Sequence, residues 1–298
     1  MSGLPTSYNT LTLPQVRLSH HPVSSPTPTP VIIMAPDRPT AHNALTDSMA
    51  SSVVCACALL WADPRVKCIV LMSSDPENRT FCADMDHHQR VRLRGTTHDE
   101  HCDTGSVVAL AMHNCAKPIV AAINGPASVR VVSRAAKVGP VSGRRVSTWR
   151  PARLYICLAS LAPGPRCTSE IVEAEQILPR ALIIAEDIAA NVSTVAIRVM
   201  RDMILRSPQS PEEAYLLESK VFFDMLNRKD SKEGKDSFLQ KCAPHFDGTM
   251  GKDAPSSYLW WEEKDVKAKI RAEIKSPIGE RIKCLSKHSL ELPSLVPP

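Results

Sequence analysis

Acidic side chains, histidines and a cysteine gather between positions 84 and 102, and these residue types bind metals or move protons. The segment opens with Phe81-Cys82-Ala83-Asp84-Met85-Asp86 and the pair His87-His88, and His98, His101 and Cys102 follow. Imidazole, thiolate and carboxylate groups are zinc ligands, but a zinc site also needs fixed geometry and supporting hydrogen bonds. Because a polar loop supplies neither, we favour a solvated loop and predict no metal. A metal site is the alternative.

An alternation of strands and helices must position this segment. Apolar runs over 31–36, 66–74 and 117–127 predict buried strands. Thr46 is placed as the N-cap of a helix over 47–63, and apolar spacing predicts a second helix over 105–115. Strand, helix, strand, helix, strand indicates an α/β core with right-handed crossovers.

The two ends of the chain have a different pattern. Residues 1–30 close on the run HPVSSPTPTP, which predicts a flexible or extended lead-in. Helical patterns follow the core, including a helix over 210–226 opened by Ser-Pro-Glu-Glu, and a helical run over 230–241. The predicted organisation is a flexible segment 1–30, a core 31–195, a helical region 196–270 and a tail 271–298.

Composition excludes several classes of protein. Hydrophobic residues at 43% and charged residues at 22% are globular values for the 298-residue chain. A charge of +5 with only 4% aromatics argues against a nucleic-acid-binding protein. Ten cysteines without a CxxC motif, several inside apolar runs, predict buried thiols in a reducing compartment. No apolar run reaches the roughly 20 residues of a membrane span, so we expect a soluble cytoplasmic protein unless it is targeted elsewhere.

Six segments in one order resemble the crotonase superfamily, the enoyl-CoA hydratases and isomerases. Together they cover about residues 30 to 250, and the run 248–261 further resembles a fungal branch of that family. The resemblance implies an α/β fold with a spiral core of ββα repeats and a helical C-terminal region. The six segments are RPTAHNALTDSM, DPRVKCIVLMSS, FCADMD, KPIVAAINGPA, AAKVG and NRKDSKEGKDSFLQK.

The same resemblance implies a site for an acyl-CoA thioester, with coenzyme A as part of the substrate and no other cofactor. Two backbone N–H groups stabilise the oxyanion of an enolate, and a carboxylate moves a proton. The N–H of Met85 matches the first donor, and Asp84 stands where the family has glycine. Asp99 and Glu100 fall where some members carry an acid, although a solvated helix face is the favoured reading. The CoA-binding residues implied are Thr40, Ala41, His42, Ala83, Asp84, Met85 and Gly125.

The chain departs from the family pattern after Gly125. About a dozen residues of the second, glycine-rich donor turn are absent, and about 128–169 are disrupted. Read from the third base of each codon, Arg145–Arg153 can encode Gly-Ile-Asn-Met-Glu-Ala-Cys-Ser, and Tyr155–Ala162 can encode Tyr-Leu-Pro-Arg-Leu-Ile-Gly. Both are motifs of the related branch, so our hypothesis is that about 145–169 are out of frame. The family's catalytic glutamate is lost with this segment.

The nearest remaining acids are Glu170, Glu173 and Glu175, for which the sequence gives no position. A nucleic-acid patch is an alternative reading of the arginine-rich stretch 143–167. It is disfavoured because few aromatic residues are interleaved with the arginines.

The predicted function is hydration or isomerisation of a fatty enoyl-CoA, in a homo-trimer or hexamer, within fungal secondary-metabolite (toxin) biosynthesis. The resemblance implies a peroxisomal location. The tripeptide 268–270, Ala-Lys-Ile, resembles a peroxisomal signal, but such a signal is read at a free chain end. Two alternatives stay open: an inactive relative that binds acyl-CoA or joins oligomers of an active one, and the non-functional product of a damaged gene.

Overall fold

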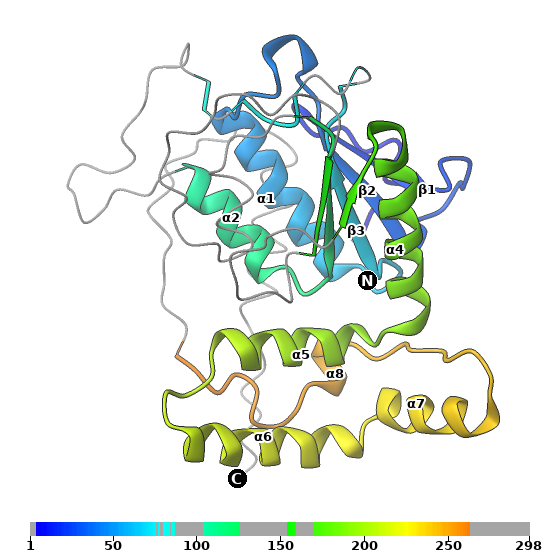
Figure 1. The fold of residues 1–298 in the computed structure, drawn as a ribbon, viewed down its shortest axis with the longest axis vertical. Helices are drawn as coiled ribbons and strands as arrows, with labels where there is room; N and C mark the ends of the chain where they lie inside the picture. The colour runs from blue at the N-terminus through cyan, green and yellow to red at the C-terminus, as the bar shows by residue number, and fades with distance from the viewer. Residues whose placement is uncertain are drawn as a thin grey trace.

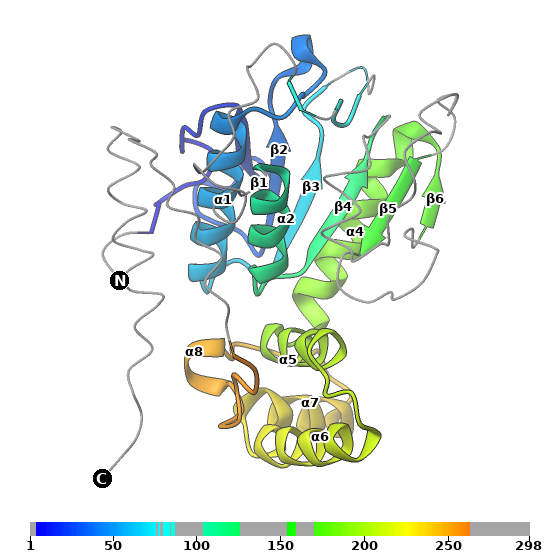
Figure 2. The ribbon, with the colours of Figure 1, turned by 90° about the vertical axis from the view of Figure 1, so that its left-hand side faces the viewer.

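The computed structural model describes residues 4–75, 77, 80–83, 85–86, 104–125, 154–158 and 170–262. These residues form one six-stranded sheet whose strands follow their order in the chain, as Figure 2 shows. Strands β2, β3 and β4 are parallel, while β1, β5 and β6 pair antiparallel with their neighbours. The strands are β1 (Val16–His21), β2 (Val31–Pro36), β3 (Cys68–Met72), β4 (Ile119–Ile123), β5 (Leu154–Leu158) and β6 (Glu170–Val172).

Helices cover both faces of the sheet. Helices α1 (Asp47–Ala62) and α2 (Thr104–Asn114) lie on one face, and α4 (Ile177–Asn191) lies on the other (Figure 1). Alternate residues of a strand point to opposite faces, so Ile32 and Met34 join the α1 core while Val31 and Ile33 pack with α4. The predicted α/β core is confirmed.

Local capping explains where two helices begin. The Thr46 side chain accepts a hydrogen bond from the N–H of Met49 at 3.0 Å, which confirms Thr46 as the N-cap of α1. The Ser210 side chain accepts from the N–H of Glu213, and Pro211 occupies the first turn of helix α6 (Pro211–Leu226). A cap satisfies an N–H group that has no partner inside the helix.

A layer of helices lies beneath the sheet in Figure 1: α5 (Thr194–Leu205), α6, α7 (Lys229–Gln240) and the short α8 (Met250–Asp253). Two arginines of α5 join this layer to the core. Arg198 donates to the carbonyl of Asn114 at 2.8 Å, and Arg201 donates to the carbonyl of Cys115 at 2.9 Å. Guanidinium groups thereby meet the negative end of α2, which favours cations.

The expectation of a flexible segment 1–30 is wrong for residues 16–21, and a second strand forms inside the arginine-rich stretch, where none was predicted. Residues 16–21, inside the predicted flexible lead-in, form β1, because Val16 and Leu18 are buried and alternate with the exposed Arg17. Residues 154–158, inside the arginine-rich stretch that shows no strand pattern, form β5 against β4. The remainder of 143–167, the disrupted residues 128–153 and the tail 271–298 lie outside the described residues.

The cysteines that lie in apolar runs are buried free thiols, as predicted. Burial raises the pKa of Cys55 to about 11 and that of Cys68 to about 12, so both thiols stay protonated at neutral pH. Within the described parts of the chain, no helix is long and apolar enough to cross a membrane.

Candidate functional site

Three chain segments meet where parallel strands end. A turn over 38–43 follows β2, a loop over 73–86 follows β3, and a turn at 124–125 follows β4. The turn after β2 contains the short helix η1 (Pro39–Ala41). Because β2, β3 and β4 are parallel, their carboxyl ends lie at one edge of the sheet. In such sheets ligands bind outside that edge.

A buried polar network holds the three segments together. The Asn43 side chain donates to Ser73 Oγ at 2.8 Å, and Ser73 Oγ donates to the carbonyl of Thr80 at 3.0 Å. The N–H of Ser73 donates to Asn124 Oδ1 at 2.8 Å, and Asn124 Nδ2 donates back to the carbonyl of Ser73 at 3.3 Å. Asn43 and Ser73 are fully buried, so each of these bonds forms away from water.

The loop after β3 is fastened to the turn after β2. The N–H of Ala83 donates to the carbonyl of His42 at 3.0 Å. The N–H of Asp86 donates to the carbonyl of Leu45, also at 3.0 Å. Arg38 donates to the Asp86 carboxylate at 3.0 Å and to the carbonyl of Ala44 at 2.7 Å. The ion pair is mostly shielded from solvent, with the Asp86 side chain 10% exposed.

The backbone N–H of Met85 points away from the segment to which the loop is bonded. Met85 forms a parallel bridge with Leu45, and the N–H of Asp86 donates to the carbonyl of Leu45 at 3.0 Å. Successive residues of a paired strand direct their N–H groups to opposite sides, so the N–H of Met85 faces away from Leu45. None of the described residues accepts a hydrogen bond from it. A donor held in this way can stabilise an oxyanion.

The predicted CoA-binding residues of the first two segments come together. Thr40, His42 and Ala83 are exposed, and Ala41 is half-buried. His42 adopts a left-handed backbone with φ 51°, and its Nδ1 lies 3.4 Å from Thr80 Oγ1. The turn and the loop thus present one continuous surface beside the amide of Met85.

Gly125 lies at the third segment, directly after Asn124. Its φ of 127° is one that L side chains rarely adopt, which explains the glycine. Asp84, Asp99 and Glu100 lie outside the described residues. Of the alternative metal site, Asp86 is described and pairs with Arg38, while its histidines and Cys102 are not described. The described part of the chain holds no cluster of three metal-binding side chains.

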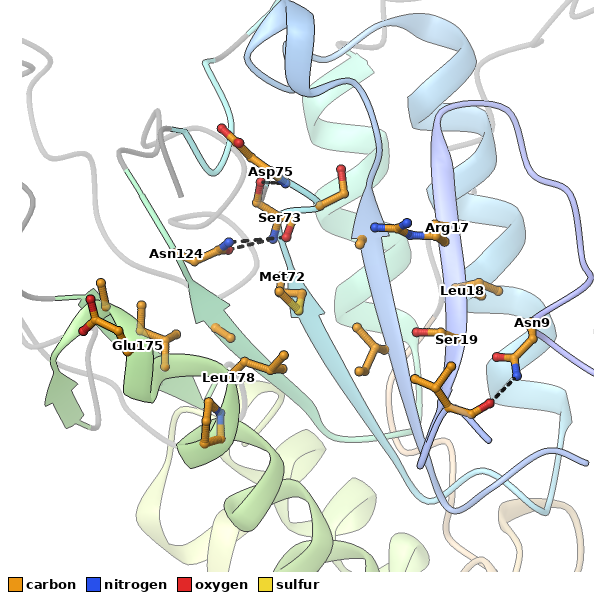
Figure 3. A pocket seen from close by; sticks show the side chains of 18 residues that line it. Asn9, Arg17, Leu18, Ser19, Met72, Ser73, Asp75, Asn124, Glu175 and Leu178 are labelled. Carbon is orange, nitrogen blue, oxygen red and sulfur yellow. Dashed lines mark hydrogen bonds between the residues drawn. The ribbon is translucent and has the colours of Figure 1, made fainter. Parts of the chain in front are cut away.

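A cavity of about 680 Å³ opens on the α4 side of the sheet (Figure 3). Ser73 and Asn124 of the polar network form part of its wall, so the cavity borders the candidate site. Figure 3 shows Glu175 and Leu178 on one wall, and Arg17 and Ser19 of β1 on the other. The short helix η3 (Ala174–Gln176) carries Glu175.

The sequence reasoning missed the residues that position the site. Asn43, Ser73 and Asn124 are polar residues that directly follow a turn or an apolar strand. That placement was a usable signal, because a polar residue at the carboxyl end of a parallel strand lies at the edge where ligands bind.

Comparisons with known proteins agree with this architecture. The sequence profile of the family "Enoyl-CoA hydratase/isomerase" matches residues 27–129. The chain is 36% identical to enoyl-CoA hydratase AFT3-1 of Alternaria alternata over 262 residues, which cover 77% of this chain and 86% of that protein. It is 27% identical to enoyl-CoA hydratase EchA19 of Mycobacterium tuberculosis, over 72% of this chain and 92% of that protein.

Solved structures share the fold. An enoyl-CoA hydratase from Mycobacterium smegmatis superposes with a TM-score of 0.58 at 19% identity, over 79% of this chain and 100% of that one. The identity and coverage of the Alternaria protein extend the likeness from fold to family. The chain therefore belongs to the enoyl-CoA hydratase/isomerase family of the crotonase superfamily, in the branch that includes these fungal proteins.

Proposed function

We propose that this chain binds a fatty enoyl-CoA and adds water to its double bond, with the N–H of Met85 as one donor to the thioester oxygen. Relatives that share 36% identity with it are named enoyl-CoA hydratases, which favours hydration over isomerisation. We assign the contact with the CoA portion to Thr40, His42 and Ala83, and their exposure to solvent supports this assignment. Coenzyme A enters as part of the substrate.

One observation carries the proposal: the loop that holds Met85 is fixed on both sides of its amide. Ala83 and Asp86 both donate backbone bonds to the turn after β2, and Arg38 pairs with Asp86. A donor that is already aimed needs no reorganisation during the reaction, and one such donor typically contributes about 10²–10³ in kcat.

Turnover of crotonyl-CoA by the purified protein, followed by the loss of enoyl-thioester absorbance, tests the proposal. Met85→Pro removes the N–H, whereas the matched variant Met85→Leu keeps it. We expect Met85→Pro to lower kcat by about 100-fold or more and Met85→Leu to stay near wild type. CoA binding measured by calorimetry and thermal unfolding check that the proline variant is folded. Equal turnover of the two variants would contradict the role of this amide.

A non-catalytic role is the second candidate. The sequence after Gly125 lacks the glycines of a second donor turn, and a single donor stabilises an oxyanion less than a pair does. An inactive relative would bind CoA without turnover, either alone or within oligomers of an active protein. Aggregation on expression would instead indicate the product of a damaged gene.

We also propose that the chain forms a homo-oligomer, as a trimer or hexamer. Helices α6 and α7 expose large apolar side chains: Phe222, Phe223 and Phe238 are 63%, 70% and 72% exposed, and Leu239 is 65% exposed. Apolar patches of this kind commonly mark protein interfaces. A peroxisomal location and a role in toxin biosynthesis rest on the resemblance alone and stay predictions.

A further inference from the structure

The cavity in Figure 3 lies on the opposite face of the sheet from the loop that holds Met85. Met85 packs against the core cluster on the α1 side, whereas Ile33 and Ala122, two residues that line the cavity, belong to the cluster on the α4 side. The cavity is therefore a separate space, and an inference about its occupant does not depend on the proposed function.

The floor of the cavity is apolar. Ile33, Met72 and Ala122 come from β2, β3 and β4, and Leu178 of α4 closes the opposite side. A volume of about 680 Å³ lies within the range that is usual for small-molecule sites. Because apolar surface gains free energy when it leaves water, this floor favours the hydrocarbon part of a ligand.

One corner of the cavity carries a cation. Val16 and Leu18 of β1 are buried in the α1 core, so Arg17, the residue between them, projects from the other face of the sheet. Arg17 pairs in register with Ala35, near the end of β2, and Figure 3 shows its side chain extending from β1 toward Ser73. Arg17 is exposed, and no described residue accepts a hydrogen bond from its guanidinium group. Its N–H donors are therefore available to a ligand.

A buried hydroxyl group lies in the same corner. The N–H of Ser74 donates to the carbonyl of Pro36 at 3.2 Å, and Pro36 pairs in register with Val16, the neighbour of Arg17. Ser74 lines the cavity, yet its Oγ is buried and forms no hydrogen bond with any described residue. Buried polar atoms in folded proteins nearly always have a partner, and a ligand in the cavity would supply one here.

Two acids also line the cavity, but their carboxylates are directed elsewhere. Asp75 is 2% exposed and is held in its own turn, where its Oδ1 accepts from the N–H of Glu77 at 3.1 Å. Glu175 lies on the far wall, and its carboxylate is turned away from Arg17 in Figure 3. The charged group that faces the apolar floor is therefore the guanidinium of Arg17.

We infer that this cavity binds an amphipathic monocarboxylate, a medium-chain carboxylic acid in its free form. Its carboxylate accepts hydrogen bonds from Arg17 and from Ser74 Oγ, and its hydrocarbon chain lies over Ile33, Met72 and Ala122. A guanidinium group matches a planar carboxylate with two parallel N–H bonds, and such a charge-assisted pair is stronger than a bond between neutral groups. Burial of the hydrocarbon chain supplies the rest of the affinity.

Calorimetric titration of the purified protein with octanoate tests the inference. We expect octanoate to bind, and we expect octanol and octylamine, which have the same chain without a carboxylate, to bind at least about tenfold more weakly. Coenzyme A should not displace octanoate, because the cavity and Met85 lie on opposite faces of the sheet. A protein that does not bind octanoate, that binds octanol equally well, or that releases octanoate to coenzyme A would overturn the inference.

Arg17→Gln tests the polar corner, and Lys235→Gln is its matched control, because Lys235 is also exposed but lies on α7 and does not line the cavity. We expect Arg17→Gln to lower the affinity for octanoate at least about tenfold and to leave the affinity for octanol unchanged. Ser74→Ala should lower the affinity for octanoate several-fold, and Lys235→Gln should match the wild type. Thermal unfolding checks that each variant is folded. Equal octanoate affinity in Arg17→Gln and the wild type would overturn the assignment of the carboxylate to this corner.

Placement of the hydrocarbon chain has its own test. Ser19 lies on the edge strand β1 and lines the cavity, so Ser19→Phe fills part of it from the rim. We expect the affinity for octanoate to fall several-fold and the affinity for butyrate, whose chain is shorter, to fall less. An equal effect on both acids would overturn the placement of the chain.

Discussion

Replacing Asn43 with alanine should loosen the whole candidate site. The Asn43 side chain accepts from the N–H of Arg38 at 2.8 Å and donates to Ser73 Oγ at 2.8 Å, so it joins the turn after β2 to the end of β3. The backbone of Asn43 is also in the left-handed conformation, with φ 51°, which asparagine tolerates and alanine does not. The variant therefore loses two buried bonds and gains backbone strain.

The expected loss is about 3 kcal/mol of unfolding free energy, because each buried bond contributes about 1 kcal/mol and left-handed alanine costs roughly as much. Denaturant unfolding measures it, and the slope with denaturant should not change. Asn43→Gly is the control: it loses the same bonds without the strain, so it should be about 1 kcal/mol more stable than Asn43→Ala. CoA affinity should fall several-fold in both variants. A loss below about 1 kcal/mol in Asn43→Ala would refute the importance of the network.

Three further predictions concern other parts of the fold. A Cβ on Gly248 would lie 2.6 Å from the Asp230 carboxylate, so Gly248→Ala should lower the unfolding free energy by about 2 kcal/mol in a denaturant assay. A Cβ on Gly251 would meet nothing within 4 Å, so Gly251→Ala should be neutral in the same assay. Burial and three nearby arginines lower the pKa of His113 from 6.5 to about 4, so the unfolded chain binds an extra proton in that window and stability falls as pH falls through it. His113→Gln should shrink the drop in melting temperature between pH 7 and pH 4.5, and an unchanged drop would contradict this account. Phe223→Glu on the exposed face of α6 should reduce the oligomer mass measured by light scattering, and an unchanged mass would exclude this face as the interface.

The core was predictable because its elements carry strong local signals. The apolar run over 66–74 contains β3, and Thr46 with Asp47 marks the start of α1 as the structure has it. The N-terminal strand β1 was not predicted, because its short buried-exposed alternation lies next to a proline-rich run that signals irregular structure. Its strand form depends on pairing with β2, a contact that the local sequence does not contain.

The site was only partly predictable. Met85 and Gly125 were named from motifs of a few residues; the structure places Gly125 just after β4 and Met85 in the loop that follows β3. The partners that hold them lie far apart in the chain: Asn43 binds a side chain 30 residues away, and Ser73 binds Asn124 51 residues away. Side-chain pairing at such separations depends on sheet register, which a single sequence does not reveal.

The arrangement of these contacts separates binding from turnover. Thr40, His42 and Met85 belong to segments fastened by Arg38, Asn43 and Ser73, all of which precede Gly125 in the chain. The departure from the family pattern lies after Gly125, so it leaves this surface and the proposed donor, the N–H of Met85, in place. The resemblance implies that the family's proton-transfer group would lie within the altered stretch. Variants of Asn43 should therefore act mainly on CoA affinity, while Met85→Pro should act on kcat. A protein in which both sets of variants changed the same quantity would contradict this division.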